Sequence, residues 1–329
     1  MKILAAIDGS SYSQTALDAL SSIHWPVDTE IKLLTVTKPG SNSANAANKN
    51  SDEGKSSAKS IDKIITDLQQ AMPVCKISSE TVQGDAKTKI LEYSRKWAAN
   101  LVIMGTRGSK GFDLMLQGSV SQGVLTQAPC PVVIVKSDPD EPPRHEKFMK
   151  VLVATDNSPY GEAALNWLNS LDWQADTHFR LVTVISALTD LLGEVATPDM
   201  AERVATEHTQ MKKAATTELQ NLEKKLASKV GTQRVSSEIG EGDPKGLIVQ
   251  MATDWNADLI VMGSHGRTGL KKLFLGSVSQ SVAINAGCSV AIVRGIVPQG
   301  RYDNKETGKF QMPKFSADAK EKAKAELSD

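Results

Sequence analysis

Two stretches of the chain share one pattern: Leu101-Val-Ile-Met-Gly-Thr-Arg-Gly108 in the first half and Leu259-Ile-Val-Met-Gly-Ser-His-Gly266 in the second. The same five residues follow in each half, as Gly118-Ser-Val-Ser-Gln122 and as Gly276-Ser-Val-Ser-Gln280. Nearly half of the positions stay identical, without a gap, up to the last apolar run of each half. Similarity of this length indicates two tandem copies of one domain, and every other motif is interpreted within that repeat.

Each copy alternates apolar segments with helical patterns. Ser158 and Pro159, for example, mark the start of a helix directly after an apolar run. Strands that are apolar throughout and separated by helices are typical of a parallel sheet covered on both faces. The sequence therefore predicts an α/β fold with a Rossmann-like domain in each copy. The predicted strands are Lys2–Asp8, Glu30–Thr37, Lys76–Gln83, Leu101–Met104 and Pro131–Val135 in the first copy, and Val151–Asp156, His178–Ile185, Gln233–Ile239, Leu259–Met262 and Ser289–Val293 in the second.

The composition is that of an ordinary globular protein. The 329 residues include 38 Lys and Arg and 38 Asp and Glu, so no global field favours a polyanion, and a nucleic-acid-coating role is not expected. The longest apolar runs are strand-sized, shorter than a membrane helix needs, and the opening residues do not form a secretory signal. Three widely spaced cysteines argue against a disulfide framework. We therefore expect a soluble, cytoplasmic protein.

The segments outside the repeat give the expected domain bounds. Residues 1–137 form the first domain, 138–147 a proline-rich linker, 148–295 the second domain and 296–329 a polar tail. Within the first copy, Pro39–Ser60 is rich in small polar residues and predicts a mobile loop.

The chemistry is expected where the glycines recur with the same spacing. The motif is Gly105-x2-Gly108-x9-Gly118-Ser119 in the first copy and Gly263-x2-Gly266-x9-Gly276-Ser277 in the second. Glycines at a strand end let the backbone approach a ligand, and the helix that follows offers unpaired amides and a positive dipole to phosphates. The serine hydroxyls add donors. The alternative is a set of glycine turns followed by a serine-capped helix, without any ligand.

An aspartate ends the first strand of each copy, at Asp8 and Asp156. Ligands of open α/β sheets bind beyond the carboxyl ends of the strands, where a carboxylate can bind ribose or adenine. The alternative role, an aspartate that closes a turn before a helix, is equally compatible with the sequence.

Other kinds of site are not indicated. The chain has no GxxxxGK[ST] loop, no GxSxG elbow and no HExxH pair, and its five histidines are scattered. Cys130 and Cys288 share one repeat position before the last strand, where a small buried residue is expected.

At these glycines, aspartates and closing strands the chain resembles the universal stress protein family, here as a two-domain member, over nearly all of residues 1–137 and 148–295. The resemblance implies a five-stranded parallel sheet in the order 3-2-1-4-5, association through the fifth strands, and ATP binding, with Mg²⁺ left open. It implies these ATP-binding residues: Asp8, Val36, Met104, Gly105, Arg107, Gly108, Gly118, Ser119, Val120 and Ser121 in the first copy, and Asp156, Val184, Met262, Gly263, His265, Gly266, Gly276, Ser277, Val278 and Ser279 in the second.

Three functions remain open on this basis. The first is an ATP-binding stress-response protein that acts as a sensor or signalling module without turnover. The second is a slow ATPase on the same scaffold, although no general base or carboxylate pair for Mg²⁺ stands beside the glycine motif. The third is an interaction scaffold that binds no nucleotide. No membrane or nucleic-acid partner is expected.

Two expectations concern the relation between the copies. The strands Pro131–Val135 and Ser289–Val293 are apolar edges that need cover, which predicts an internal pseudo-dimer, and the first copy alone is expected to form a homodimer. His265 replaces Arg107 in the second motif. Because Arg is permanently charged and His is mostly neutral near pH 7, the first site is expected to bind nucleotide more tightly.

Overall fold

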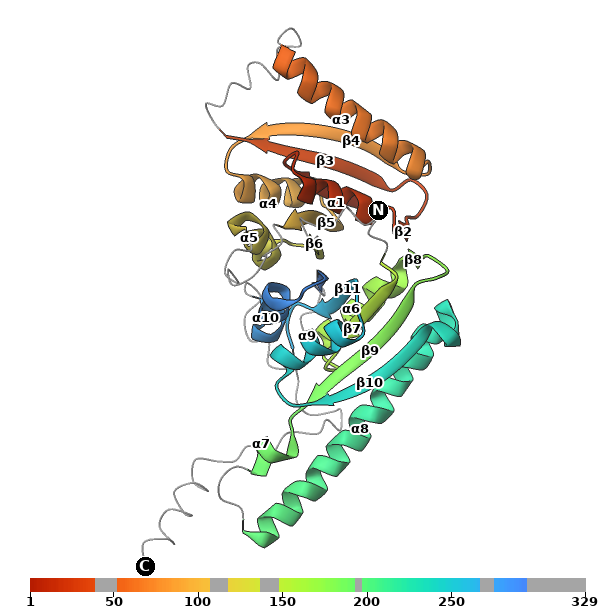
Figure 1. Ribbon diagram of the computed structural model, residues 1–329, viewed down its shortest axis with the longest axis vertical. Helices are drawn as coiled ribbons and strands as arrows, with labels where there is room; N and C mark the ends of the chain where they lie inside the picture. The colour runs from red at the N-terminus through yellow and green to blue at the C-terminus, as the bar shows by residue number, and fades with distance from the viewer. Residues whose placement is uncertain (39–51, 107–117, 137–147, 193–196, 267–274, 295–329) are drawn as a thin grey trace, which may run out of the picture. The chain divides into compact units, whose positions relative to one another are not determined.

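A computed structural model describes residues 1–38, 52–106, 118–136, 148–192, 197–266 and 275–294 (Figure 1). The interdomain linker and the polar tail that the sequence predicts lie outside these ranges. Among the described helices, none has both the length and the apolar character that a membrane span requires.

In the first copy, strands and helices alternate along the chain. The elements are β1 (Lys2–Ile7), α1 (Ser11–Leu20), β2 (Ile23–His24), β3 (Glu30–Thr37), α3 (Asp52–Ala71), β4 (Lys76–Gln83), α4 (Ala86–Lys96), β5 (Leu101–Thr106), α5 (Ser119–Gln127) and β6 (Val132–Lys136).

Within the described residues, the second copy repeats this order with one further short helix and a 3-10 turn. Its elements are β7 (Lys150–Ala154), α6 (Pro159–Ser170), β8 (Asp172–Trp173), β9 (His178–Ile185), α7 (Leu188–Leu192), α8 (Pro198–Val230), η1 (Thr232–Arg234), β10 (Val235–Glu241), α9 (Pro244–Asp254), β11 (Leu259–Gly263), α10 (Ser277–Asn285) and β12 (Ser289–Val293).

The main strands of each copy are parallel to one another. They lie in the order β4-β3-β1-β5-β6 in the first copy and β10-β9-β7-β11-β12 in the second, so the first strand is central in both. Strands β6 and β12 pair antiparallel, with Ala291 opposite Val133, and this pairing joins the copies into one ten-stranded sheet. The two short strands β2 and β8 pair separately.

Apolar side chains are buried on both faces of the sheet, as the continuous apolar runs predict. Ile3 and Ala5 of β1 belong to the core shared with α1 and α6, whereas Leu4 and Ala6 belong to the core shared with α4 and α5. Successive residues of a strand point to opposite faces, so a strand that is buried on both sides must be apolar at every position.

Local sequence signals set the helix starts. Ser10 and Ser158 are N-caps whose hydroxyls accept the amides of Ser13 and Gly161. Asp85 opens α4 in the same way through the amide of Thr88. A cap side chain satisfies one of the amides that a helix start leaves without a partner.

Two sequence expectations are wrong in their bounds. The loop predicted over Pro39–Ser60 is too long, because α3 already begins at Asp52. A helix that packs over its later turns can extend at little cost through good helix formers such as Lys55 and Ala58. The strand predicted at Gln233–Ile239 starts two residues later, because Gln233 and Arg234 belong to the 3-10 turn η1.

Helix α8 is longer than α3, its counterpart in the first copy. It has 33 residues and runs along β10, where Leu219 and Leu226 pack into the core (Figure 1). These two leucines lie on the helix face expected from their spacing. Met200, near its start, is exposed.

Candidate functional site

A cavity of about 460 Å³ opens at the carboxyl ends of β7, β9 and β11 in the second copy. This is the edge at which open parallel sheets bind ligands, and the volume lies in the range of small-molecule pockets. All ten residues predicted for the second site line it: Asp156, Val184, Met262, Gly263, His265, Gly266, Gly276, Ser277, Val278 and Ser279.

The cavity has further walls that the motif did not include. Thr155 directly follows β7 and precedes Asp156. Val182 lies in β9, two residues before Val184. The strand periodicity of two could have indicated Val182 from Val184. Pro244 and Ile248 come from α9, one turn apart on one helix face, and only the packing of α9 against the sheet brings them here.

The start of α10 forms one end of this cavity and has no side-chain cap. Its N-cap is Gly276, which carries no hydroxyl or carboxylate, and Ser277 behind it is exposed. The serine cap in the alternative is therefore wrong, whereas its other part, a helix start without any ligand, stays a prediction. The first amides of such a helix are unsatisfied within the helix and lie at the positive end of its dipole, which suits an anion.

The serine hydroxyls do not all point toward the cavity. The hydroxyl of Ser279 is buried and donates to the carbonyl of Gly263 at 2.8 Å, and the hydroxyl of Ser121 donates to the carbonyl of Gly118 at 2.9 Å. These two hydroxyls tie the helix start to the backbone. In this arrangement the hydrogens of these two hydroxyls are engaged within the protein.

Both aspartates close turns. The amide of Ser10 donates to Asp8 Oδ1 at 3.0 Å, and the amide of Ser158 donates to Asp156 Oδ1 at 3.1 Å. Burial opposes the charge of Asp8, but the hydrogen bonds from Ser10 outweigh it and lower the pKa of Asp8. The turn role is therefore present in both copies. Asp156 also lines the cavity, so one residue has both features that the sequence suggested as alternatives.

The glycines of the second motif face protein rather than empty space. A Cβ on Gly263 would lie 2.6 Å from the carbonyl oxygen of Tyr160, and one on Gly266 would lie 2.8 Å from Asp156 Oδ2. A Cβ on Gly276 would lie 3.2 Å from the carbonyl oxygen of Ser264. Close packing against backbone therefore requires glycine at Gly263, whether or not a ligand is bound, whereas a side chain at Gly266 would require the Asp156 carboxylate to shift.

His265 lies in the wall of the cavity with little exposure. Its ring packs against that of Tyr160 with 5.0 Å between centroids, and its Nδ1 lies 3.1 Å from the hydroxyl of Ser264.

In the first copy the described site residues occupy equivalent places. Asp8 follows β1, Val36 lies in β3, and Met104 and Gly105 end β5. The predicted residues at the helix start are Gly118, Ser119, Val120 and Ser121. Arg107 and Gly108 lie outside the described residues.

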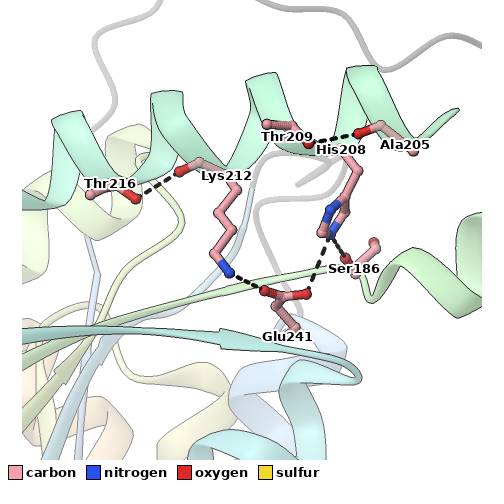
Figure 2. Close-up of polar contacts among 7 residues, drawn as sticks. All are labelled: Ser186, Ala205, His208, Thr209, Lys212, Thr216 and Glu241. Carbon is pink, nitrogen blue, oxygen red and sulfur yellow. Dashed lines mark hydrogen bonds and ion pairs between the residues drawn. The ribbon is translucent and has the colours of Figure 1, made fainter. Parts of the chain in front are cut away.

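A polar cluster links α8 to Glu241 at the end of β10 and to Ser186 just after β9 (Figure 2). His208 is buried, and its Nε2 lies 3.1 Å from the carbonyl oxygen of Ser186 and 3.5 Å from Glu241 Oε2. A carbonyl can only accept, so Nε2 carries the proton and donates it. Lys212, one turn along the helix, pairs with Glu241 Oε1 at 2.6 Å and lowers the pKa of that carboxyl.

Two residues of this cluster are close in sequence to residues that line the cavity. Ser186 comes two residues after Val184, and Glu241 comes three before Pro244. The sequence gives no signal for the role of His208, because its partners follow β9 and end β10 and no local motif connects them.

The burial of Cys130 agrees with the structural role expected for it. It is buried, and burial raises the pKa of its thiol to about 11, which disfavours the reactive thiolate. Within the described residues, no three His, Cys, Asp or Glu side chains gather as a metal site would require.

Comparison with known proteins agrees with the repeat. The model of the universal stress protein family matches residues 1–136 and again 147–294. A universal stress protein of Methanocaldococcus jannaschii is 32% identical over 149 residues, which cover 45% of this chain and 82% of that protein. The crystal structure of a universal stress protein from Archaeoglobus fulgidus covers 89% of this chain and 96% of its own, at 23% identity and a TM-score of 0.59. A functionally unknown protein from Pseudomonas aeruginosa has the same fold, with 15% identity, a TM-score of 0.57, and coverage of 89% of this chain and 92% of its own. With both halves matched by the family model, the chain belongs to the universal stress protein family.

Proposed function

We propose that this protein binds ATP, or a close adenine nucleotide, and acts in the stress response as a nucleotide-dependent sensor or signalling module. The observation that carries the proposal is the second-copy cavity, in which all ten motif residues surround one space that ends at an uncapped helix start. Such a helix start suits a phosphate chain.

The walls of the cavity divide by chemistry. Val182, Met262 and Ile248 provide apolar surface that an adenine ring would contact. Asp156 would accept hydrogen bonds from ribose hydroxyls. The amides after Gly276, with the hydroxyl of Ser277, would hold phosphate oxygens. In the first copy Asp8, Met104 and Ser119 would take the corresponding roles.

The runner-up functions differ in what happens to the nucleotide. Asp156 is the one carboxylate among the residues that line the described cavity. Mg²⁺ would therefore be held mainly by phosphates and water, and the proposal assigns no residue to hydrolysis. A slow ATPase would use the same cavity, and a scaffold would leave it without nucleotide.

The nucleotide content of the purified protein distinguishes these functions. The protein is denatured and the released small molecules are separated by ion exchange, directly and after incubation with ATP and Mg²⁺. Stable ATP supports the proposal, and ADP that grows with time and protein concentration supports the ATPase. If no nucleotide is released and calorimetric titration with ATP gives no heat of binding, the proposed function is wrong.

A further inference from the structure

The last strand of each copy leads to a cation at the same repeat position, Lys136 in the first copy and Arg294 in the second. Lys136 Nζ donates to the carbonyl oxygens of Ile284 at 3.3 Å and Ala286 at 2.6 Å. These carbonyls lie at the end of α10, which belongs to the other copy.

Arg294 makes the reciprocal contacts. Its guanidinium donates to the carbonyl oxygen of Leu125 at 2.9 Å and to that of Thr126, in the last turn of α5. Each cation therefore crosses from its own copy to the carboxyl end of a helix in the other copy. The antiparallel pairing of β6 with β12 brings them within reach.

The two helices that receive these cations are the ones that start at the glycine motif. Each has nine residues, which is about 13 Å at the usual rise per residue. The last carbonyls of a helix have no partner within it, and its carboxyl end is the negative end of the dipole, so a cation there satisfies both. In so short a helix, the last turn and the first turn cannot move independently.

Each cation is also close to the glycine loop of its own copy. Arg294 follows Val293, whose carbonyl accepts the amide of Ser264 at 2.9 Å. The carbonyl of Ser264 in turn accepts the amide of Gly276 at 2.8 Å. In the first copy Lys136 is the register partner of Thr106, at the end of the strand that leads to the loop.

We propose that Lys136 and Arg294 are positioning residues that couple the two nucleotide sites: Lys136 holds α10 for the second site, and Arg294 holds α5 for the first. The inference rests on the proposed function, since it concerns the phosphate-binding ends of these helices. A nucleotide in one copy then influences the helix of the other copy through the cation of its own copy, Lys136 at the end of β6 or Arg294 directly after β12.

Purely structural capping predicts a different pattern. If the cations only hold the copies together, removing either one weakens both sites alike. If they position the helices, Lys136→Met weakens the second site alone and Arg294→Met weakens the first site alone. The affected site is in the copy that does not contain the substitution.

Calorimetric titration with ATP tests this in two backgrounds, Gly118→Val to disable the first site and Gly276→Val to disable the second. With Gly118→Val, Lys136→Met should weaken binding about three- to ten-fold, the effect of losing one charge-assisted capping contact. With Gly276→Val it should change binding less than about two-fold. The variant Lys136→Arg keeps the charge and should restore affinity, and urea unfolding of each variant verifies the fold.

Equal losses in both backgrounds, or no loss in either, would overturn the inference. A second measurement does not need nucleotide. In the ligand-free protein, Lys136→Met should increase amide hydrogen exchange in α10 at Gln280, whose amide donates to the carbonyl of Gly276 at 2.8 Å, and not in α5. If the titrations show no ATP binding while exchange rises in α10 alone, the proposed function fails and the positioning role stands. If exchange rises in neither helix or in both, the positioning role fails.

Discussion

The missing side chain of Gly105 faces the backbone of Tyr12, because a Cβ on Gly105 would lie only 2.1 Å from the carbonyl oxygen of Tyr12. Gly263 stands in the same relation to Tyr160 in the second copy. The first glycine of each motif therefore allows a helix to pack directly on the strand end, and the motif is in part a packing motif.

Alanine at Gly105 should destabilise the fold. The new methyl group meets backbone atoms that cannot rotate away, so the free energy of unfolding should fall by about 2 kcal/mol or more, as in an overpacked core. Gly118→Ala is the matched control, because its Cβ would have only the hydroxyl of Ser121, at 3.8 Å, near it among the described atoms. Urea unfolding measures both, and equal stability of the two variants would contradict the packing role.

Valine at Gly118 and at Gly276 should each remove one nucleotide site. Their φ angles, −51° and −63°, are open to any residue, so backbone strain is not the cause. At Gly118 the effect comes from a branched side chain where phosphate approaches, and at Gly276 that side chain also meets the carbonyl oxygen of Ser264. Calorimetry should show half of the wild-type stoichiometry for each single variant and no binding for the double variant. Wild-type stoichiometry in the double variant would place the nucleotide elsewhere.

Charge at His265 should set part of the affinity of the second site. His265→Arg introduces a permanent cation, and one additional charge-assisted hydrogen bond corresponds to about five- to thirty-fold tighter binding. The measurement is ATP titration with the first site disabled by Gly118→Val. An unchanged affinity would mean that this side chain points away from the phosphates.

Lys136 should make the stability of the protein depend on pH. Burial lowers the pKa of this amine to about 8 from 10.5, so between these values the unfolded chain binds more protons than the folded one. Stability therefore rises with pH in this window and is lost as pH falls through 8, with a gain of about 1 kcal/mol from pH 7.5 to 9. Urea unfolding at both pH values should show the gain in the wild type, and Lys136→Met should lack it.

His208→Ala should loosen α8 from Ser186 and Glu241. The change leaves the carbonyl of Ser186 without its donor and should lower the free energy of unfolding by about 1–3 kcal/mol. Amide exchange should increase in the turns of α8 around His208. The control is Thr209→Ala, an exposed neighbour whose hydroxyl contacts only its own helix, at the carbonyl of Ala205 (Figure 2). Equal effects of the two variants would contradict the role of His208.

The sequence by itself determined the repeat, the α/β class and most strand and helix starts. These features depend on residues that are neighbours in the chain. A continuous apolar run such as β1 indicates a strand buried on both faces, and Ser158-Pro159 indicates a helix start, without reference to the rest of the fold. The repeated spacing indicated the glycines and the aspartate of the second site, because strand ends at one edge of a parallel sheet converge, and the family resemblance supplied the rest of the ten residues.

Only the tertiary structure decided how those residues are used. It directs the hydroxyl of Ser279 to Gly263, places His208 against Ser186, and brings Lys136 to the end of α10 in the other copy. Each of these contacts joins elements separated in the chain, and each follows from the way helices pack on the sheet and from the pairing of β6 with β12. The free energy of such contacts depends on distance and burial in the folded protein, which residue type and local spacing do not encode.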